Sequence, residues 1–97
     1  MRIFSRKTLK EYWDKHEDIE QSLRSWYTDV NQAEWKTPED IKEKYPKASF
    51  LKDSRVVFDI KGNKYRLIVR VNFPMLWVFV RFIGTHAEYD KIDANNI

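Results

Sequence analysis

The sequence contains no cysteine, two glycines, three prolines and no long apolar run. Without cysteine, the chain forms neither a disulfide framework nor a thiolate zinc site, which is compatible with the reducing cytosol. Its apolar runs are shorter than the ~20 residues that a membrane-spanning helix needs. The N-terminal segment carries charges every few residues, so it lacks the apolar stretch of a signal peptide. We therefore expect a cytoplasmic protein with no membrane association.

The scarcity of glycine and histidine excludes several kinds of site. Two glycines cannot supply a glycine-rich phosphate-binding loop, and no Gly-x-Ser-x-Gly elbow is present for serine hydrolysis. The two histidines, His16 and His86, lie far apart in sequence without metal-ligand spacing. We expect no metal and no cofactor. What remains is a chain of 97 residues, 42% hydrophobic and 34% charged, which indicates a single folded domain over residues 1–97.

Positive charge is concentrated in the C-terminal half. The net charge is +3, and residues 1–48 contain as many acidic as basic side chains. Between Lys52 and Arg81, seven basic residues face only two acidic ones, Asp53 and Asp59. This excess predicts an anionic partner for the C-terminal half. A solvated basic strand face is the alternative reading of the same residues.

The hydrophobic period changes from helical to alternating near residue 50. We predict a short strand at residues 1–4, helices at 5–15, 18–34 and 38–45, strands at 55–60, 64–72 and 76–83, and a last helical turn at 86–91. Ser5, Thr37 and Thr85 are placed to cap the first, third and last of these helices. The loop 61–63 contains a Gly and an Asn that tolerate positive φ.

This order predicts an α+β fold. The three C-terminal strands form an antiparallel meander, and the N-terminal strand joins the same sheet because four residues cannot form a stable strand alone. The helices are expected to pack on one face of this twisted, mainly antiparallel sheet.

Strand alternation assigns side chains to the two faces of that sheet. In the strand 64–72, an apolar set should face the helices (Tyr65, Leu67, Val69, Val71), and a second set should face away (Lys64, Arg66, Ile68, Arg70, Asn72). In the last strand, Trp77, Phe79, Arg81 and Ile83 alternate with Val78, Val80 and Phe82. We expect Arg66, Arg70 and Arg81 to converge on the outer face beside aromatic rings, a surface suited to phosphates and unpaired bases.

The segment FIGTHAEYDK, residues 82–91, places several proton-transfer groups where the last strand ends. An RNA phosphodiester is cut when a base removes the proton of the 2′-hydroxyl, an acid protonates the leaving 5′-oxygen and cations stabilise the phosphorane. Histidine is the side-chain type suited to proton transfer near neutral pH, so His86 is the first candidate. Tyr89 and Asp90 are further candidates, although each also has a structural reading, as a packing residue and as a partner of Lys91.

The C-terminal third resembles the HigB-type toxins of bacterial type II toxin–antitoxin pairs, which belong to the RelE-like group of mRNA endoribonucleases. The resemblance rests on the hairpin NKYRLIVRV, the strand end VRF and above all the run T-H-x-E-Y-D within GTHAEYDKID. The segment PEDIKEKYPKASFL and the N-terminal helices fit in length and position, so the resemblance spans essentially the whole chain.

The resemblance implies a RelE-like fold and a metal-independent endoribonuclease that cleaves mRNA, commonly on the ribosome. It also implies that a helix-turn-helix antitoxin neutralises the toxin. The protein would then associate with operator DNA only indirectly, through that antitoxin. Arg66 and Arg81 match the basic strand residues of the family, and His86, Tyr89 and Asp90 match its terminal motif. Lys64 and Arg70 match more loosely, and we expect both to extend the RNA-binding track together with Lys52, Trp77 and Lys91.

The role of each residue stays open at this stage, because the wider group differs in which residue serves as the base. Three other functions also remain open. These are a non-catalytic RNA- or ribosome-binding module, a toxin that attacks a protein such as a DNA topoisomerase, and a structural protein with a solvated basic sheet.

Overall fold

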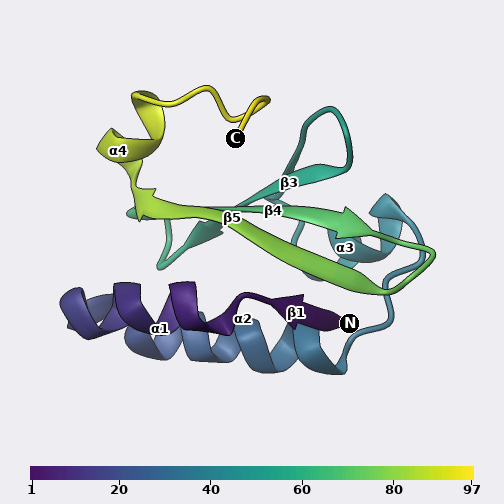
Figure 1. The fold of residues 1–97 in the computed structure, drawn as a ribbon, viewed down its shortest axis with the longest axis horizontal. Coiled ribbons are helices and arrows are strands. Elements are labelled where there is room, and N and C mark those ends of the chain that lie inside the picture. Colours follow the sequence, from purple (N-terminus) through teal and green to yellow (C-terminus); the bar gives the residue numbers. More distant parts are fainter.

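A computed structural model describes residues 1–97 and shows an α+β fold, as predicted (Figure 1). The elements in chain order are β1 (Arg2–Phe4), α1 (Arg6–Lys15), a 3-10 turn η1 (Glu17–Ile19), α2 (Glu20–Gln32), α3 (Pro38–Lys44), β2 (Ser49–Phe50), β3 (Arg55–Ile60), β4 (Tyr65–Asn72), β5 (Trp77–Thr85) and α4 (His86–Asp90). Each predicted helix and strand is present. The two-residue strand β2 was not predicted.

The five strands form one sheet in the order β1-β5-β4-β3-β2. Strands β2 to β5 are antiparallel to their neighbours, whereas β1 pairs in parallel with β5. The first strand therefore joins the sheet as expected, and it does so at an edge. The turn between β3 and β4 has positive φ at Gly62, as its sequence allows, and also at Lys61.

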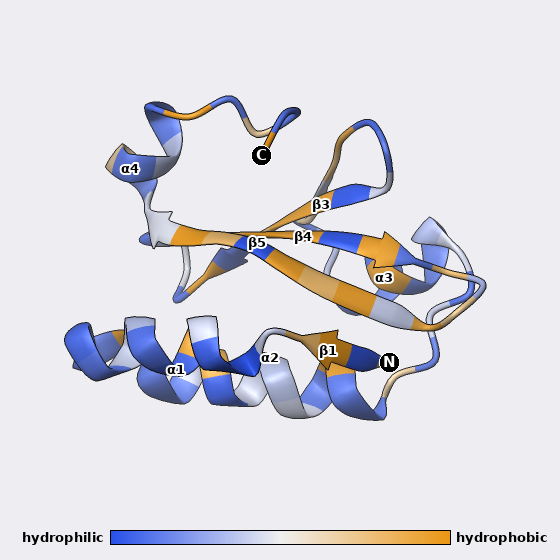
Figure 2. Cartoon of the chain, in the orientation of Figure 1, coloured by the Kyte–Doolittle hydropathy of each residue, from blue (hydrophilic) through white to orange (hydrophobic).

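The core lies between the sheet and the helices α1, α2 and α3. Hydrophobic residues recur along α1 and α2 at helical spacing and are buried, among them Leu9, Trp13, Leu23 and Trp26. They pack against the buried side of β4, which includes Leu67 and Val69 as predicted from the alternation. Figure 2 shows hydrophobic strands above helices whose solvent sides are hydrophilic. None of the helices has the length and apolar character needed to cross a bilayer.

A β-bulge changes the facing of the last strand. Val80 pairs with Val69, but Phe82 pairs with Ile68, so Arg81 is left as an extra residue between the two pairs. The extra residue reverses the alternation beyond it. Ile83 therefore belongs to the core cluster, and its pairing with Leu67 places it on the helix side. The prediction that Ile83 shares the face of Trp77 and Phe79 was wrong, and Phe82 takes that face instead.

The N-terminal helices pack on one face of the sheet as predicted, and the short helix α4 lies on the other side (Figure 1). The chain after α4 continues over the same outer face, where the Ile97 carbonyl accepts a hydrogen bond from Arg55 Nε at 2.9 Å. Val57 and Ile68, outside the main core cluster, are also almost fully buried. The outer face is therefore partly covered by the C-terminal segment.

Candidate active site

The short helix α4 begins at the end of β5, and its start is fixed by a capping box. Thr85 Oγ1 accepts a hydrogen bond from the Glu88 amide at 3.1 Å, and the Glu88 carboxylate accepts one from the Thr85 amide at 2.7 Å. The predicted cap is therefore present. The His86 amide adds a hydrogen bond to the Lys64 carbonyl at 3.0 Å, which ties the first turn to the β3–β4 loop.

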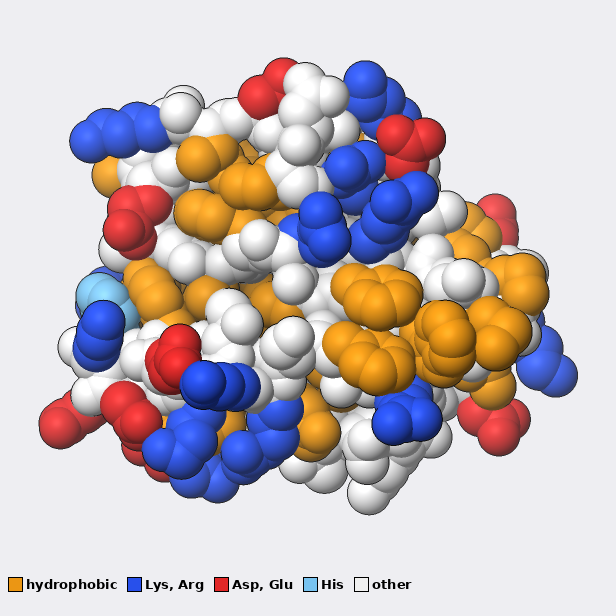
Figure 3. All heavy atoms as spheres, viewed as in Figure 1, with side chains coloured by type: hydrophobic (Ala, Val, Ile, Leu, Met, Phe, Trp, Pro, Cys, Tyr) orange, Lys and Arg blue, Asp and Glu red, His pale blue; other side chains and the backbone are white.

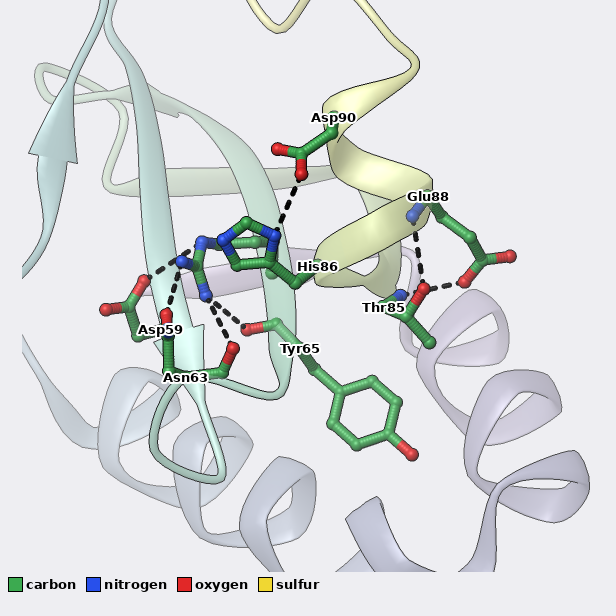
Figure 4. A network of polar contacts seen from close by, with 8 residues as sticks. Asp59, Asn63, Tyr65, Thr85, His86, Glu88 and Asp90 are labelled. Atoms are coloured by element: carbon green, nitrogen blue, oxygen red, sulfur yellow. Dashed lines mark hydrogen bonds and ion pairs between the residues drawn. The ribbon is translucent and has the colours of Figure 1, made fainter.

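His86 and Asp90 lie one helical turn apart and form a pair. His86 Nδ1 is 3.0 Å from Asp90 Oδ2, and both side chains are exposed (Figure 4). A carboxylate at Nδ1 favours the tautomer whose proton is on that nitrogen, which leaves the lone pair of Nε2 free to accept a proton. The pair therefore has the arrangement of a general base held by a positioning carboxylate.

Arg66 lies on the outer face next to α4, with its guanidinium carbon 5.9 Å from the centre of the Tyr89 ring. The guanidinium is held by Asp59 Oδ1 at 3.2 Å from Nε and by the side chain and carbonyl of Asn63. Its side chain is only 12% exposed. Arg66 is thus a fixed positive charge beside Tyr89, and its internal partners occupy most of its donors.

A contact from α1 anchors α4 to the body of the protein. Tyr12 Oη donates to Glu88 Oε1 at 3.2 Å, although the two residues are 76 positions apart in sequence. The Thr85 amide lowers the pKa of the Glu88 carboxyl, so Glu88 stays ionised at neutral pH. Burial and the nearby Glu88 raise the pKa of Tyr12, which keeps its hydroxyl protonated as the donor. Both ionisation states therefore favour this hydrogen bond.

Lys64 does not join the outer face, and that prediction was wrong. Its ammonium group lies 2.6 Å from the carboxylate of Asp18 in η1, which also accepts a hydrogen bond from Tyr65 Oη at 2.8 Å. Tyr65 belongs to the core that faces the helices. Hydrogen bonds from Lys64 and Tyr65 lower the pKa of Asp18. Lys64 is therefore part of a contact between the β3–β4 loop and the helical layer.

Arg70 and Arg81 line a hollow of about 550 Å³ on the outer face, farther along the sheet from α4. Phe79 lines the same hollow, in agreement with the prediction that it shares the outer face with Arg81. Arg66 is not part of it, so the three arginines do not converge at one point. They form two groups: Arg66 beneath α4, and Arg70 with Arg81 around the hollow.

The remaining predicted RNA-binding residues lie at three separate places. Lys52 is exposed in the turn that precedes β3, and Lys91 is exposed at the end of α4. Trp77 is half-buried and packs against Phe4 and Phe79, with ring centres 5.7 and 6.0 Å away. Figure 3, viewed as in Figure 1, shows basic side chains next to hydrophobic ones on the face that it displays.

Several residues that support the site were not predicted from the sequence. Tyr12 was read only as part of the helical apolar stripe, and the contacts of Asp59 and Asn63 with Arg66 were not anticipated. The pairing of Asp59 with Arg66 follows from the hairpin register, so the alternating pattern of both strands contained that signal. No local pattern indicated the contact of Tyr12 with Glu88. No group of three or more His, Asp or Glu side chains in the structure is placed to hold a metal ion.

Comparison with known proteins identifies the family. Residues 19–92 match a family model described as HigB_toxin, the RelE-like toxic component of a toxin–antitoxin system. The chain belongs to the HigB toxin family. This confirms the resemblance seen in the sequence, and membership of a toxin–antitoxin system implies an antitoxin partner.

Two curated HigB proteins match nearly the whole chain. The mRNA interferase HigB of Escherichia coli O6:H1 is 32% identical over 94 residues, covering 95% of this chain and 91% of that protein. The mRNA interferase toxin HigB of Escherichia coli K12 is 28% identical over 96 residues, covering 97% and 92%. The similarity to HigB proteins therefore includes β1 and α1, which precede the part matched by the family model.

Proposed function

We propose that this HigB-family toxin is an mRNA endoribonuclease whose reaction takes place at α4. The observation that carries the proposal is the His86–Asp90 pair, with a free imidazole nitrogen, on a helix that lies beside the fixed charge of Arg66. The names of the HigB relatives, which describe mRNA interferases, support the same activity.

In this mechanism, His86 Nε2 accepts the proton of the 2′-hydroxyl as its oxygen attacks the adjacent phosphorus. The bond from phosphorus to the 5′-oxygen breaks, and an acid protonates that oxygen, for which we propose Tyr89. The products are a 2′,3′-cyclic phosphate and a 5′-hydroxyl, and no metal is required. Asp90 orients His86, and the positive charge of Arg66 stabilises the phosphorane, while Arg81 binds the phosphate of an adjoining nucleotide.

The two arginines have different proposed roles. Arg81 is exposed and has no hydrogen bond or ion pair within the protein, so its whole guanidinium is available to a phosphate. Arg66 is held by Asp59 and Asn63, and it contributes a positioned charge with little freedom to move. Arg70, Lys52, Trp77 and Lys91 extend the RNA track. We propose ribosome-bound mRNA in the cytoplasm as the substrate and a helix-turn-helix protein as the antitoxin, through which alone operator DNA is met.

Expression of the chain in a bacterium, followed by primer extension on a reporter mRNA, tests this proposal. We expect new 5′ ends within the reporter and arrested growth for the wild-type protein, and neither for His86→Ala. Growth arrest by both proteins with intact mRNA would refute cleavage and would indicate a module that blocks translation by binding. DNA damage with intact mRNA would indicate a protein target instead.

A further inference from the structure

The hollow lined by Arg70 and Arg81 lies outside the α4 site and has a polar side, a basic side and an aromatic side. Strands β4 and β5 contribute Arg70, Phe79 and Arg81, and the turn before β3 contributes Asp53 and Ser54. Its volume of about 550 Å³ falls within the usual range for sites that hold small organic ligands.

We propose that this hollow is a subsite for one nucleotide of single-stranded RNA flanking the cleaved bond. The two guanidinium groups bind the phosphate, Phe79 contacts the base, and the turn containing Asp53 and Ser54 discriminates between bases. The inference rests on the proposed function and adds to it a site of substrate selection.

The positive charges around the hollow favour the binding of an anion. Arg81 has no partner in the protein, and Arg70 uses only Nε, which donates to the Asp53 carbonyl at 3.2 Å. The Asp53 carboxylate is directed instead to Arg55, whose Nη1 lies 3.3 Å from its Oδ2. No internal carboxylate therefore neutralises Arg70 or Arg81. Two unneutralised guanidinium groups beside one hollow are well suited to a phosphate.

The aromatic side is held in a fixed orientation. The Phe79 ring stacks on Phe4 with centres 5.1 Å apart and an angle of 17° between planes. Trp77 meets Phe79 at 87°. Because these neighbours fix the ring, a base that contacts Phe79 needs no rearrangement of the protein. Such contacts are the usual way in which proteins bind unpaired bases.

The turn supplies hydrogen-bonding groups at a defined position. Asp53 and Ser54 have φ values of 58° and 59°, and the Ser54 carbonyl accepts a hydrogen bond from the Val71 amide at 2.9 Å. The second oxygen of the Asp53 carboxylate and the Ser54 hydroxyl have no partner in the protein. The carboxylate oxygen only accepts, so it favours a base that presents an amino group over uracil, which lacks one, whereas the Ser54 hydroxyl can donate or accept.

The position along β5 fits a flanking nucleotide. Arg81 precedes Thr85, the cap of α4, by four residues, which corresponds to about 13 Å along an extended strand. RNA cleaved at α4 therefore reaches the hollow with a neighbouring nucleotide.

The direct test measures binding of short 2′-O-methyl RNAs, which cannot be cut because they lack the attacking hydroxyl. Fluorescence anisotropy at constant salt should show about tenfold weaker binding by Arg70→Ala than by the wild type. The matched control is Lys36→Ala, which removes an exposed charge from the loop before α3 and should stay within twofold. Equal losses in the two variants would overturn the subsite and leave only a general charge effect.

A second measurement distinguishes binding of a whole nucleotide from binding of phosphate alone. Titration with nucleoside monophosphates should shift the amide resonances of Ser54 and Val71 at lower concentrations than titration with inorganic phosphate. Equal affinity for both would overturn the claim of a base contact. Asp53→Asn, which suits the positive φ and replaces an acceptor by a donor, should weaken the preference of the RNA series for amino-bearing bases over uracil. An unchanged ranking would overturn base selection by this turn.

These results do not depend on whether α4 cleaves RNA. If the proposed function is wrong, the wild type leaves mRNA intact or His86→Ala still cleaves it, whereas the binding data on uncleavable RNA are unaffected. If only the subsite is wrong, His86→Ala loses cleavage while Arg70→Ala binds RNA as tightly as Lys36→Ala.

Discussion

Tyr12 Oη lies 3.2 Å from Glu88 Oε1 and connects the first long helix to the short helix that carries the candidate catalytic residues. A helix of five residues is not stable alone, because helix nucleation is costly. Helix α4 also contains no buried residue. Its placement therefore depends on a few contacts, of which this one comes from the most distant part of the sequence.

We predict that Tyr12→Phe lowers kcat for RNA cleavage by about tenfold and leaves KM nearly unchanged. The variant removes one hydrogen bond, so its free energy of unfolding should fall by only about 1 kcal/mol. The matched control is Tyr45→Phe, which removes a similar contact with Asp29, 3.3 Å long and distant from α4. Similar losses of kcat in both variants would contradict a positioning role for Tyr12.

Arg66 and Arg81 should respond differently to substitution. Arg66→Ala leaves the Asp59 carboxylate without its partner, so we expect a loss of about 1–3 kcal/mol in the free energy of unfolding. Arg81→Ala should change that free energy by less than about 0.5 kcal/mol, because Arg81 is exposed and has no internal partner. Urea denaturation measures both.

Cleavage should fall in both Arg66→Ala and Arg81→Ala because each variant loses a positive charge that acts on an RNA phosphate, and not because the protein is less stable. Asp59→Ala added to Arg66→Ala removes the unpaired carboxylate and should restore most of the stability. It should not restore cleavage. Recovery of cleavage in the double variant would show that Arg66 acts only through folding.

The carboxylate of Asp18 should make stability depend on pH in the acid range. Hydrogen bonds from Lys64 and Tyr65 hold its pKa below the ordinary value of 3.8. A carboxyl with a lowered folded-state pKa stabilises the fold above its unfolded pKa, and this contribution is lost as the pH falls through the folded value. We therefore predict that Asp18→Asn lowers Tm at pH 7 and that the difference from wild type shrinks below about pH 4. Glu17→Gln, which alters an exposed neighbour, should show no such dependence.

Gly84 is crowded by the side chains of Phe82 and Glu88. A Cβ at this position would be 2.6 Å from Phe82 Cζ and 3.1 Å from Glu88 Oε1. We predict that Gly84→Ala costs about 1–3 kcal/mol in unfolding free energy. It should also reduce cleavage, because it displaces the carboxylate that receives the Tyr12 hydrogen bond. Gly62 has a positive φ, and a Cβ there would meet no atom within 4 Å. Gly62→Ala should therefore lower the free energy of unfolding. Its cleavage rate should fall no further than the loss of folded protein explains.

The sequence predicted the elements well because their signals are local. Thr37 and Pro38 mark the start of α3, and strict alternation marks β4, so both agree with the structure within one residue. The bulge at Arg81 was not predictable. Phe82 and Ile83 are both apolar, so the hydrophobic pattern does not indicate which of the two faces the helices. Strand β2 is too short to produce a periodic signal.

The candidate site was only partly predictable. The run from His86 to Asp90 could be read as a helix face because the two residues are four apart, which brings them together in any α-helix. The contacts of Tyr12 with Glu88 and of Lys64 with Asp18 connect segments 76 and 46 residues apart and depend on the packed fold. The same holds for the hollow, which combines the turn before β3 with two strands.

Proton transfer by His86 during RNA cleavage at α4 is tested by one comparison. Cleavage of a defined mRNA is measured for the wild type, for His86→Ala and for the control Tyr45→Phe, together with binding of an uncleavable RNA. We predict that His86→Ala cleaves at least about 100-fold more slowly while it binds RNA within twofold of the wild type. Cleavage by His86→Ala at the wild-type rate would show that His86 does not transfer the proton.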